Sequence, residues 1–416
     1  MHDRLFHPHQ IRFWRRQANQ IKEGGLSALL HKSLYALRLA SVVPVVLLLR
    51  ALRPLVLVRF GYLISHHIGL FAGNTEIYLC ERDAGLQPKR TIDIFHHGYI
   101  ISNHQLKTMW DRTLHVSPLG KWLYLANNLL PAGSAHVVPL LTDIDYHRVI
   151  PGSKTHLSFT PEEEDLGRAG LRDLGLPEGA PFVCIYGRDP AYKSRIFPNQ
   201  DDSRHDYRNM SIQNLVPAAE ELARRGFYVI RMGAEVNEAL QTTNPMIVDY
   251  ATSARSDFMD VFLSANCRIF VGGTGGFNAV PRLFRRPVVF DNVIPLWTDQ
   301  LLGYPPGCLV IPKKLWRREE QRSMTFREFL ETGPETFPGP IHFENIGVDV
   351  VESTPEEIIA VAVEMDDRLK GTWKATEEDR HLQQRFWSLL KLNDSNEKFR
   401  PRMGAEFLRQ NRELLD

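Results

Sequence analysis

Short apolar runs alternate with amphipathic stretches most regularly between residues 180 and 290. The runs have the length and β-branched content of buried parallel strands. They occupy residues 182–186, 227–231, 268–271 and 287–290. The stretches 212–225 and 256–265 have the spacing of helices with one apolar face. This succession of strands and helices predicts a Rossmann-like lobe, the usual frame of a nucleotide site.

A similar alternation precedes it. Residues 55–60 predict a strand ending in a turn at Gly61, residues 62–80 a helix, residues 91–95 a strand and residues 102–112 a helix. Thr160 followed by Pro161 and four acidic residues predicts a helix start.

The predicted fold class is therefore α/β, with two Rossmann-like lobes and a basic, apolar helical segment before them. The predicted divisions are an N-terminal segment, an acceptor-side lobe, a nucleotide lobe, and a C-terminal part with two helices and a polar tail. Their bounds are residues 1–54, 55–155, 156–350 and 351–416.

The N-terminal segment is basic and apolar. Residues 10–35 resemble a basic amphipathic helix, and residues 37–58 are strongly apolar but interrupted by three arginines and two prolines. Arginines at the centre of a spanning helix cost several kcal/mol. These residues therefore suit a helix lying in the headgroup layer, with its arginines on lipid phosphates, better than one crossing the membrane. The alternative is a buried helix leading into the first strand.

Length and composition limit the function classes. A chain of 416 residues with 43% hydrophobic content accommodates two packed lobes. The net charge of +1 gives no reason to expect nucleic acid as a partner. The four cysteines are scattered, without a CxxC pair, which fits a reducing compartment. No cleavable signal peptide is recognisable, so the expected location is the cytoplasm, at the inner face of the cytoplasmic membrane.

A glycine-rich loop follows the third strand of the nucleotide lobe. It reads Gly272-Gly273-Thr274-Gly275-Gly276 and leads into a short helix that contains Asn278. Glycines let a ligand approach the backbone, and amides at a helix start favour an anion. The loop predicts a phosphate site, with Thr274 as an added hydroxyl donor. The alternative is a tight turn between strand and helix.

The same loop also allows a dinucleotide interpretation. Gly273, Gly275 and Asn278 fall one glycine short of the GxGxxG fingerprint, and Asp291 ends the next strand near the expected spacing. Asn278 in place of the third glycine, and the late position in the chain, make a nicotinamide enzyme the weaker interpretation.

Cations follow two apolar strands of this lobe. Arg188-Asp189 follows one strand, and Arg231-Met-Gly233 ends the next. Ligands bind at the carboxyl ends of strands in such sheets, and an arginine grips a diphosphate with two hydrogen bonds. Five residues of the polar loop after Arg188 are further candidates for donor binding: Lys193, His205, Tyr207, Arg208 and Asn209. A solvated charged loop is the alternative.

Histidines cluster in the first half of the chain, including the adjacent pair His66-His67. His67 or Glu76 is expected to act as general base on an attacking hydroxyl. A metal site is the competing idea, but adjacent histidines rarely bind one ion, so none is predicted. A structural role is the alternative for any single histidine.

Several motifs together resemble a bacterial glycosyltransferase family of surface-carbohydrate biosynthesis loci. They are Ile68-Gly69 with Asn74-Thr-Glu-Ile-Tyr-Leu79, Gly187-Arg-Asp189, His205-Asp-Tyr-Arg-Asn209, Tyr228-Val-Ile-Arg-Met-Gly233, Asp257-Phe-Met-Asp260, Phe270-Val-Gly-Gly-Thr-Gly-Gly276, Thr354-Pro-Glu-Glu-Ile358 and Leu369-Lys-Gly-Thr-Trp373. The similarity extends over roughly residues 55–390. The family's Gly-His pair near the first-strand loop is absent, because His66-His67-Ile68-Gly69 stands there.

The resemblance implies a GT-B fold, a nucleotide-sugar donor held by the C-terminal lobe, a polysaccharide or lipopolysaccharide-type acceptor, and no obligatory metal or further cofactor. The expected mechanism is direct attack of an acceptor hydroxyl on the anomeric carbon. Arg188, Lys193 or Arg231 and the glycine-loop amides would then stabilise the departing diphosphate. The competing functions are a nicotinamide-dependent sugar-modifying enzyme and a non-catalytic, membrane-associated assembly module.

Overall fold

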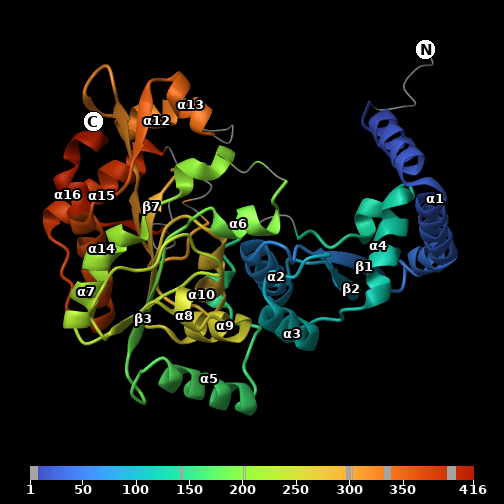
Figure 1. Cartoon of the computed structure of the whole chain (residues 1–416), viewed down its shortest axis with the longest axis horizontal. Coiled ribbons are helices and arrows are strands. Elements are labelled where there is room, and N and C mark those ends of the chain that lie inside the picture. Colours follow the sequence, from blue (N-terminus) through green and yellow to red (C-terminus); the bar gives the residue numbers. More distant parts are fainter. Residues whose placement is uncertain are drawn as a thin grey trace. The chain divides into compact units, whose positions relative to one another are not determined.

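The computed structural model describes residues 8–140, 144–199, 201, 203–296, 301, 303–331, 339–390 and 400–416 (Figure 1). For residues 8–24, 28, 331 and 341 it describes the backbone alone. The chain forms two compact units. The first comprises Met1–Leu63, Pro88–His97 and Leu114–Pro139, and the second comprises Ile64–Gln87, Gly98–Thr113 and Leu140–Asp416. The stretch predicted as one lobe, residues 55–155, is therefore shared between both units.

Unit 1 contains a small parallel sheet. Strand β1 (Leu57–Leu63) pairs with β2 (Thr91–His97) in register, and isolated bridges at Val116 and Val137 extend the pairing. The turn predicted at Gly61 is wrong, because Gly61 lies inside β1 opposite Phe95. A Cβ at Gly61 would lie 2.3 Å from the Phe95 ring, so the glycine makes room for a neighbouring side chain.

Helix α1 (Pro8–Ala51) forms the N-terminal part of unit 1. It bends at Gly25, whose φ of 57° is not helical, and it continues through Pro44. One face packs on α4 (Pro118–Leu129), with Val46 fully buried and Arg50 Nε donating to Asn127 Oδ1 at 3.0 Å. The 3₁₀ turn η1 (Gly133–His136) follows α4.

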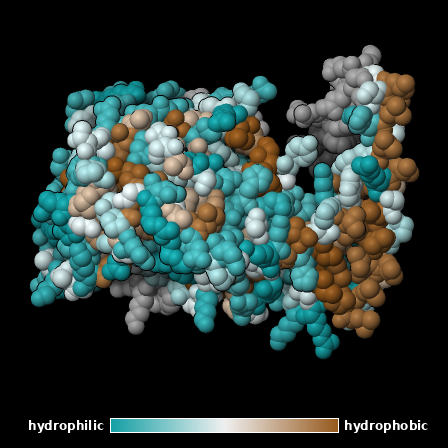
Figure 2. Space-filling view, turned by 60° about the horizontal axis from the view of Figure 1, so that its bottom comes forward, coloured by the Kyte–Doolittle hydropathy of each residue, from teal (hydrophilic) through white to brown (hydrophobic). Residues whose placement is uncertain are grey.

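The outer face of α1 is apolar and exposed. Leu34, Leu37, Val45 and Leu48 are between 46% and 67% exposed. Figure 2 shows hydrophobic side chains gathered along this side of unit 1. From Gly25 to Ala51 the helix is long and apolar enough to cross a membrane, by length and composition only, and 6% of its most apolar window is buried.

Unit 2 is built on a seven-stranded parallel sheet with the order β12-β8-β7-β6-β3-β4-β5. Its strands are β3 (Phe182–Tyr186), β4 (Tyr228–Arg231), β5 (Ile247–Val248), β6 (Ile269–Gly272), β7 (Val288–Val293), β8 (Leu309–Pro312) and β12 (Arg402–Met403). Their apolar side chains form one core. The predicted α/β class, with parallel sheets and an apolar N-terminal helix, is confirmed.

The helices and turns of unit 2 pack on this sheet or on one another (Figure 1). The α-helices are α2 (Ile68–Asp83), α3 (His104–Thr113), α5 (Pro161–Asp173), α6 (Ala191–Ile196), α7 (Val216–Arg224), α8 (Tyr250–Ser253), α9 (Asp257–Asn266), α10 (Ala279–Leu283), α12 (Phe326–Glu331), α13 (Pro340–Asn345), α14 (Pro355–Lys370), α15 (Glu377–Leu389) and α16 (Ala405–Gln410). The 3₁₀ turns are η2 (Ile150–Gly152), η3 (Ser203–Arg208), η4 (Ile212–Leu215), η5 (Gly276–Asn278) and η7 (Arg412–Leu415). The predicted start of α5 is confirmed, because Thr160 and Glu163 form a capping box.

A second, antiparallel sheet joins β9 (Lys314–Arg317) to β10 (Arg322–Ser323) and β11 (Val348–Val351). The polar tail predicted at the C-terminus is wrong for residues 400–416. Strand β12 pairs with β8, and Phe407, Leu408, Leu414 and Leu415 are buried. These apolar residues are too few and too widely spaced to form a helix or strand pattern in the sequence.

Candidate functional site

The strand order of unit 2 reverses beside β3. From β3 the chain proceeds outward to β4 and β5, then returns to place β6 on the other side of β3, with β7 and β8 beyond. In open parallel sheets ligands bind outside the carboxyl ends of the strands at such a switch point. Both Arg188, which follows β3, and the glycine loop, which follows β6, lie at this point. The tertiary structure thus brings together the two main signals of the sequence.

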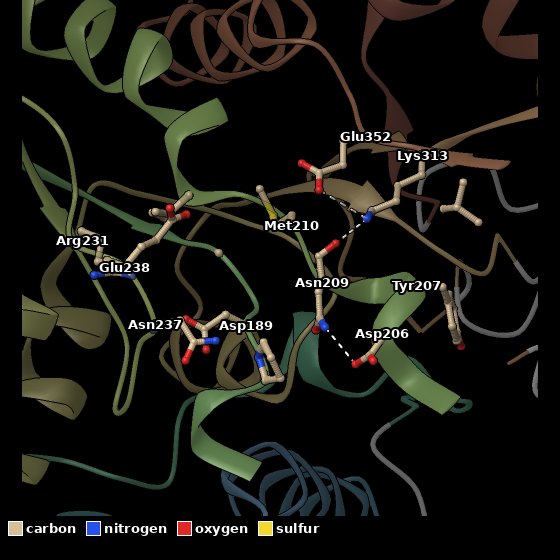
Figure 3. A pocket seen from close by; sticks show the side chains of 14 residues that line it. Asp189, Asp206, Tyr207, Asn209, Met210, Arg231, Asn237, Glu238, Lys313 and Glu352 are labelled. Atoms are coloured by element: carbon tan, nitrogen blue, oxygen red, sulfur yellow. Dashed lines mark hydrogen bonds and ion pairs between the residues drawn. The ribbon is translucent and has the colours of Figure 1, made fainter. Parts of the chain in front are cut away.

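A cavity of about 480 Å³ opens at this edge of the sheet (Figure 3). Its walls come from the ends of β3, β4 and β8, the loop 206–212, and the end of β11. Its polar lining residues are Asp189, Asp206, Tyr207, Asn209, Arg231, Asn237, Glu238, Lys313 and Glu352. Four of these side chains are carboxylates and two are cations. The cavity therefore offers mainly hydrogen-bond acceptors to a ligand.

Arg188 and Asp189 organise the loops around the cavity. The Arg188 guanidinium donates to the His205 carbonyl at 3.1 Å and to the Asn209 side chain. The Asp189 carboxylate accepts from the amides of Ala191 and Asn237, at 2.7 and 2.9 Å. Arg188 is buried and does not line the cavity, so its observed role is to hold the cavity wall.

Lys313 was missed by the sequence analysis. It follows β8, and its Nζ donates to the Asn209 carbonyl and lies 3.9 Å from Glu352 Oε1 (Figure 3). Burial lowers the pKa of this lysine, while Glu352 and Asp291 oppose the shift. The available signal was its position directly after an apolar run, the same signal that drew attention to Arg188 and Arg231.

Arg231 reaches the cavity but is already paired. It is 1% exposed, and its Nη1 lies 2.9 Å from Asp249 Oδ1, while Nη2 donates to the Glu238 carbonyl at 3.2 Å. Breaking a buried pair of this kind is costly, so a structural role accounts for Arg231 without a ligand. Gly233 follows it with a φ of 157°, and a Cβ there would lie 2.7 Å from Val236.

The glycines of the loop are each explained by a close protein neighbour. A Cβ at Gly273 would lie 2.6 Å from Met210 Sδ, and one at Gly275 would lie 2.7 Å from the Tyr186 ring. A Cβ at Gly272 would lie 2.9 Å from the Tyr186 carbonyl, and Gly276 packs against α2. The number of glycines is therefore no longer evidence for a ligand. The phosphate site stays a prediction that rests on the loop's position.

Polar side chains contact the backbone of the glycine loop. Gly276 is exposed, while Thr274 is buried with its Oγ1 accepting the Ile294 amide at 3.4 Å. Arg208 Nη2 donates to the Thr274 carbonyl at 3.3 Å, so this cation lies between the loop and the cavity. Asn278 Nδ2 donates to the Gly273 carbonyl at 2.6 Å, which shows a loop-stabilising role for Asn278.

Asp291 is fully buried inside β7, two residues before the strand ends. Within the described part of the chain neither of its carboxylate oxygens makes a hydrogen bond of normal geometry. Burial, reinforced by Glu352 and opposed by Lys313, raises the pKa of Asp291 to about 8. The dinucleotide interpretation requires this carboxylate to bind a ribose, and a carboxylate enclosed in this way does not reach one.

The amino end of α2 abuts the glycine loop. A Cβ at Gly69 would lie 2.7 Å from both Cα and O of Gly276, so the two backbones touch. His67 is the N-cap residue of α2 and makes no side-chain cap. Its ring lies 5.9 Å from the ring of Phe197, which directly follows α6, the helix that carries Lys193. The structure thus places His67, Lys193 and the glycine loop in the same unit.

The surroundings of Glu76 do not fit its predicted role as general base. It is 1% exposed, with Oε1 2.7 Å from Arg285 Nη2 and Oε2 3.2 Å from His156 Nδ1. A carboxylate enclosed by two partners does not meet an acceptor hydroxyl. We therefore withdraw Glu76 as a catalytic candidate and retain His67. The sequence around Glu76 could not predict this pairing, because both partners lie far away along the chain.

The remaining predicted residues lie around the cavity. Tyr207 lines it, with its ring 5.6 Å from that of Phe343, and burial raises the pKa of its hydroxyl. Asn209 Nδ2 donates to Asp206 Oδ1 at 3.0 Å. His205 and Arg208 belong to η3, on the same loop.

No family model and no curated protein matches the sequence. Solved structures similar to the chain include E. coli ADP-heptose lps heptosyltransferase II, at 12% identity, covering 61% of this chain and 90% of that chain with a TM-score of 0.35. They also include the glycosyl transferase family 9 from Veillonella parvula DSM 2008, at 11% identity, 56% and 79% coverage and a TM-score of 0.35. The wall teichoic acid polymerase TagF is similar at 10% identity, 70% and 71% coverage and a TM-score of 0.27. Scores this low carry no argument about activity.

Proposed function

We propose that this protein is a glycosyltransferase that moves a sugar from a nucleotide-sugar donor to a surface glycan of the polysaccharide or lipopolysaccharide type. The observation that carries the proposal is the cavity of about 480 Å³ at the switch point of the parallel sheet. Its volume lies within the range of small-molecule sites. The nature of the acceptor rests on the family resemblance of the sequence.

The donor would bind with its nucleoside in the cavity. Carboxylates such as Asp206 and Glu238 suit ribose hydroxyls and the amino groups of a base, and they disfavour a diphosphate. The diphosphate would instead lie toward Arg208 and Gly276, where the amides that begin α2 and η5 also favour an anion. Lys313 lies in the cavity wall and would balance part of the donor's charge.

In the transfer, an oxygen of the acceptor attacks the anomeric carbon as the bond from that carbon to the diphosphate breaks. The imidazole of His67 would take the acceptor's proton. Negative charge grows on the leaving diphosphate, and Arg208, Lys193 and the loop amides would stabilise it. Arg188 acts by holding the wall of the cavity. The proposed reaction uses no metal and no cofactor beyond the donor.

The nicotinamide alternative fits the residues less well. A dinucleotide fingerprint needs loop glycines that admit the pyrophosphate, but Tyr186 and Met210 occupy the space beside Gly275 and Gly273. The carboxylate that should meet the ribose, Asp291, is fully buried. Both observations favour a transferase.

A thermal-shift panel with UDP, GDP, ADP, CMP, NAD and NADP tests the proposal on the full chain. One nucleoside diphosphate, or CMP, is expected to raise Tm, and Lys313→Met is expected to reduce that shift. Lys107→Met changes an exposed lysine on α3 and serves as the matched control. Stabilisation by NAD or NADP alone would support the nicotinamide enzyme. Unchanged polysaccharide synthesis with Arg188→Ala would support the non-catalytic module.

We further propose that unit 1 binds the inner face of the cytoplasmic membrane through α1. Exposed apolar residues run along α1 from Leu26 to Leu48, while α4 covers part of the helix. Arginines and a proline interrupt this apolar stretch, which suits a helix lying in the headgroup layer better than one crossing the bilayer. Basic residues greatly outnumber Asp3 and Glu23 before Gly61, which complements anionic lipid headgroups.

Sedimentation with phosphatidylglycerol vesicles tests this location. The full chain is expected to bind them, and Leu37→Glu with Leu48→Glu is expected to reduce binding. Leu86→Glu, an exposed leucine in unit 2, is the matched control. A protein that lies in the plane is released by alkaline carbonate. Retention after that wash would show that α1 spans the bilayer.

A further inference from the structure

Three unlike side chains meet in the interior of unit 2, away from the cavity. Glu76 and Cys80 lie one turn apart on α2, and both are almost fully buried. His156, from the loop before α5, reaches the same place with its Nδ1 3.2 Å from Glu76 Oε2. One ligand atom from each of the three lies within 4.8 Å of the others.

We propose that Glu76, Cys80 and His156 bind one divalent transition-metal ion, expected to be zinc. Thiolate, imidazole and carboxylate are the donor groups that zinc takes in proteins. With zinc bonds of about 2.0–2.3 Å, adjacent ligand atoms of a tetrahedral site lie about 3.3–3.8 Å apart. The separation from His156 Nδ1 to Glu76 Oε2 is 3.2 Å, and one ligand atom from each residue, the Cys80 sulfur included, lies within 4.8 Å of the other two. Small side-chain adjustments therefore complete three ligand positions and leave a fourth for water.

The groups behind these ligands have the arrangement of a metal site's outer shell. Asp83 Oδ2 lies 3.0 Å from His156 Nε2, so a carboxylate fixes the ring from its far side. Arg285 Nη2 donates to Glu76 Oε1 at 2.7 Å and leaves Oε2 directed at His156. Carboxylates behind ligating histidines, and hydrogen bonds to ligating carboxylates, orient ligands in this way.

The competing explanation is a buried ion-pair network without metal. Arg285 and a protonated His156 would then balance Glu76 and Asp83. In that network the fully buried Cys80 thiol accepts a hydrogen bond from Arg285 Nη2 at 3.4 Å and donates one to Glu76 Oε1 at 3.7 Å. Only the metal site makes this sulfur a ligand. The absorption band of a metal-bound sulfur therefore distinguishes the two explanations.

The ion would act on structure and not on the transfer reaction. Cys80 follows His67 by 13 residues along α2, which is about 20 Å at 1.5 Å per residue. The site joins α2 to the loop of His156 and to Arg285, which follows α10. It would thereby fix the helix whose amino end contacts the glycine loop.

Metal analysis of the purified full chain tests the site. We expect one zinc per chain by mass spectrometry after gel filtration, and a fall in Tm on treatment with a chelator. Cobalt added to the metal-free protein should give a near-ultraviolet sulfur-to-metal band, which Cys80→Ser abolishes. Cys308→Ser, another buried cysteine of unit 2, is the matched control and should retain the band. Asp83→Asn should weaken zinc binding about tenfold.

Folded wild-type protein without zinc, and with a Tm insensitive to zinc and chelator, would overturn the proposal in favour of the ion-pair network. Zinc bound with the same affinity by Asp83→Asn and Cys80→Ser would also overturn it, by placing the ion elsewhere. If Cys80→Ser does not fold, the wild type and Asp83→Asn still decide the question. None of these outcomes bears on nucleotide binding, which the thermal-shift panel measures separately.

Discussion

Replacing Asp291 by asparagine should remove a large part of the protein's loss of stability with rising pH. The carboxyl is fully buried inside β7, and its pKa is raised to about 8 from an ordinary value of 3.8, chiefly by burial. The folded protein thus keeps a proton that the unfolded chain releases. The stability from this proton is complete below pH 4 and is lost as pH rises through 8.

The size of the effect follows from the two pKa values. Between pH 5 and pH 7 the unfolded carboxyl is ionised and the folded one is protonated, so stability falls by about 1.4 kcal/mol per pH unit. Over two units the wild type should lose about 3 kcal/mol through this group alone. Asparagine has a similar shape and does not titrate, so Asp291→Asn should lack this loss.

Urea unfolding at pH 5, 6 and 7 measures the difference directly. The stability of Asp291→Asn relative to wild type should rise steadily across the series, and the contributions of other titrating groups cancel in that comparison. Asp173→Asn, at the exposed end of α5, is the matched control and should parallel the wild type. If the Asp291→Asn curve also parallels the wild type, Asp291 is not a protonated buried acid and the reasoning fails.

Three other substitutions test the packing around the site. Gly69→Ala forces a Cβ to within 2.7 Å of the glycine loop's backbone and should cost about 1–3 kcal/mol, whereas Gly152→Ala, with open space around it, should leave Tm unchanged. Arg231→Met strands the Asp249 carboxylate and should cost about 3–5 kcal/mol, measured by urea unfolding; a loss below about 1 kcal/mol would mean that the pair contributes little. Thr354→Ala removes the capping box of α14 and should lower stability by about 1 kcal/mol, seen as a small fall in Tm.

Local spacing in the sequence was sufficient to predict the elements that frame the site. Apolar runs of strand length predicted the bounds of β3, β4, β6 and β7 to within three residues, because a strand buried on both faces needs little but continuous apolar side chains. The start of α5 was equally local, since its capping box lies within four residues. Position after a strand also marked Arg188 and Arg231 as residues of the sheet's carboxyl edge.

Strand order decided what those residues do. Lys313 enters the cavity because β8 lies in the same sheet as β3, which no local pattern specifies. Asp249 neutralises Arg231 from beyond β5, a partner that only the fold supplies.

The loop glycines and Glu76 depended in the same way on distant neighbours. Tyr186, Met210 and α2 explain the glycines by packing, where the sequence alone suggested a ligand. Glu76 met His156 and Arg285, which are 80 and 209 residues away in the chain. The sequence determined the elements through contacts between near neighbours, whereas the chemistry of the buried polar groups was decided by partners that meet only when the sheet assembles.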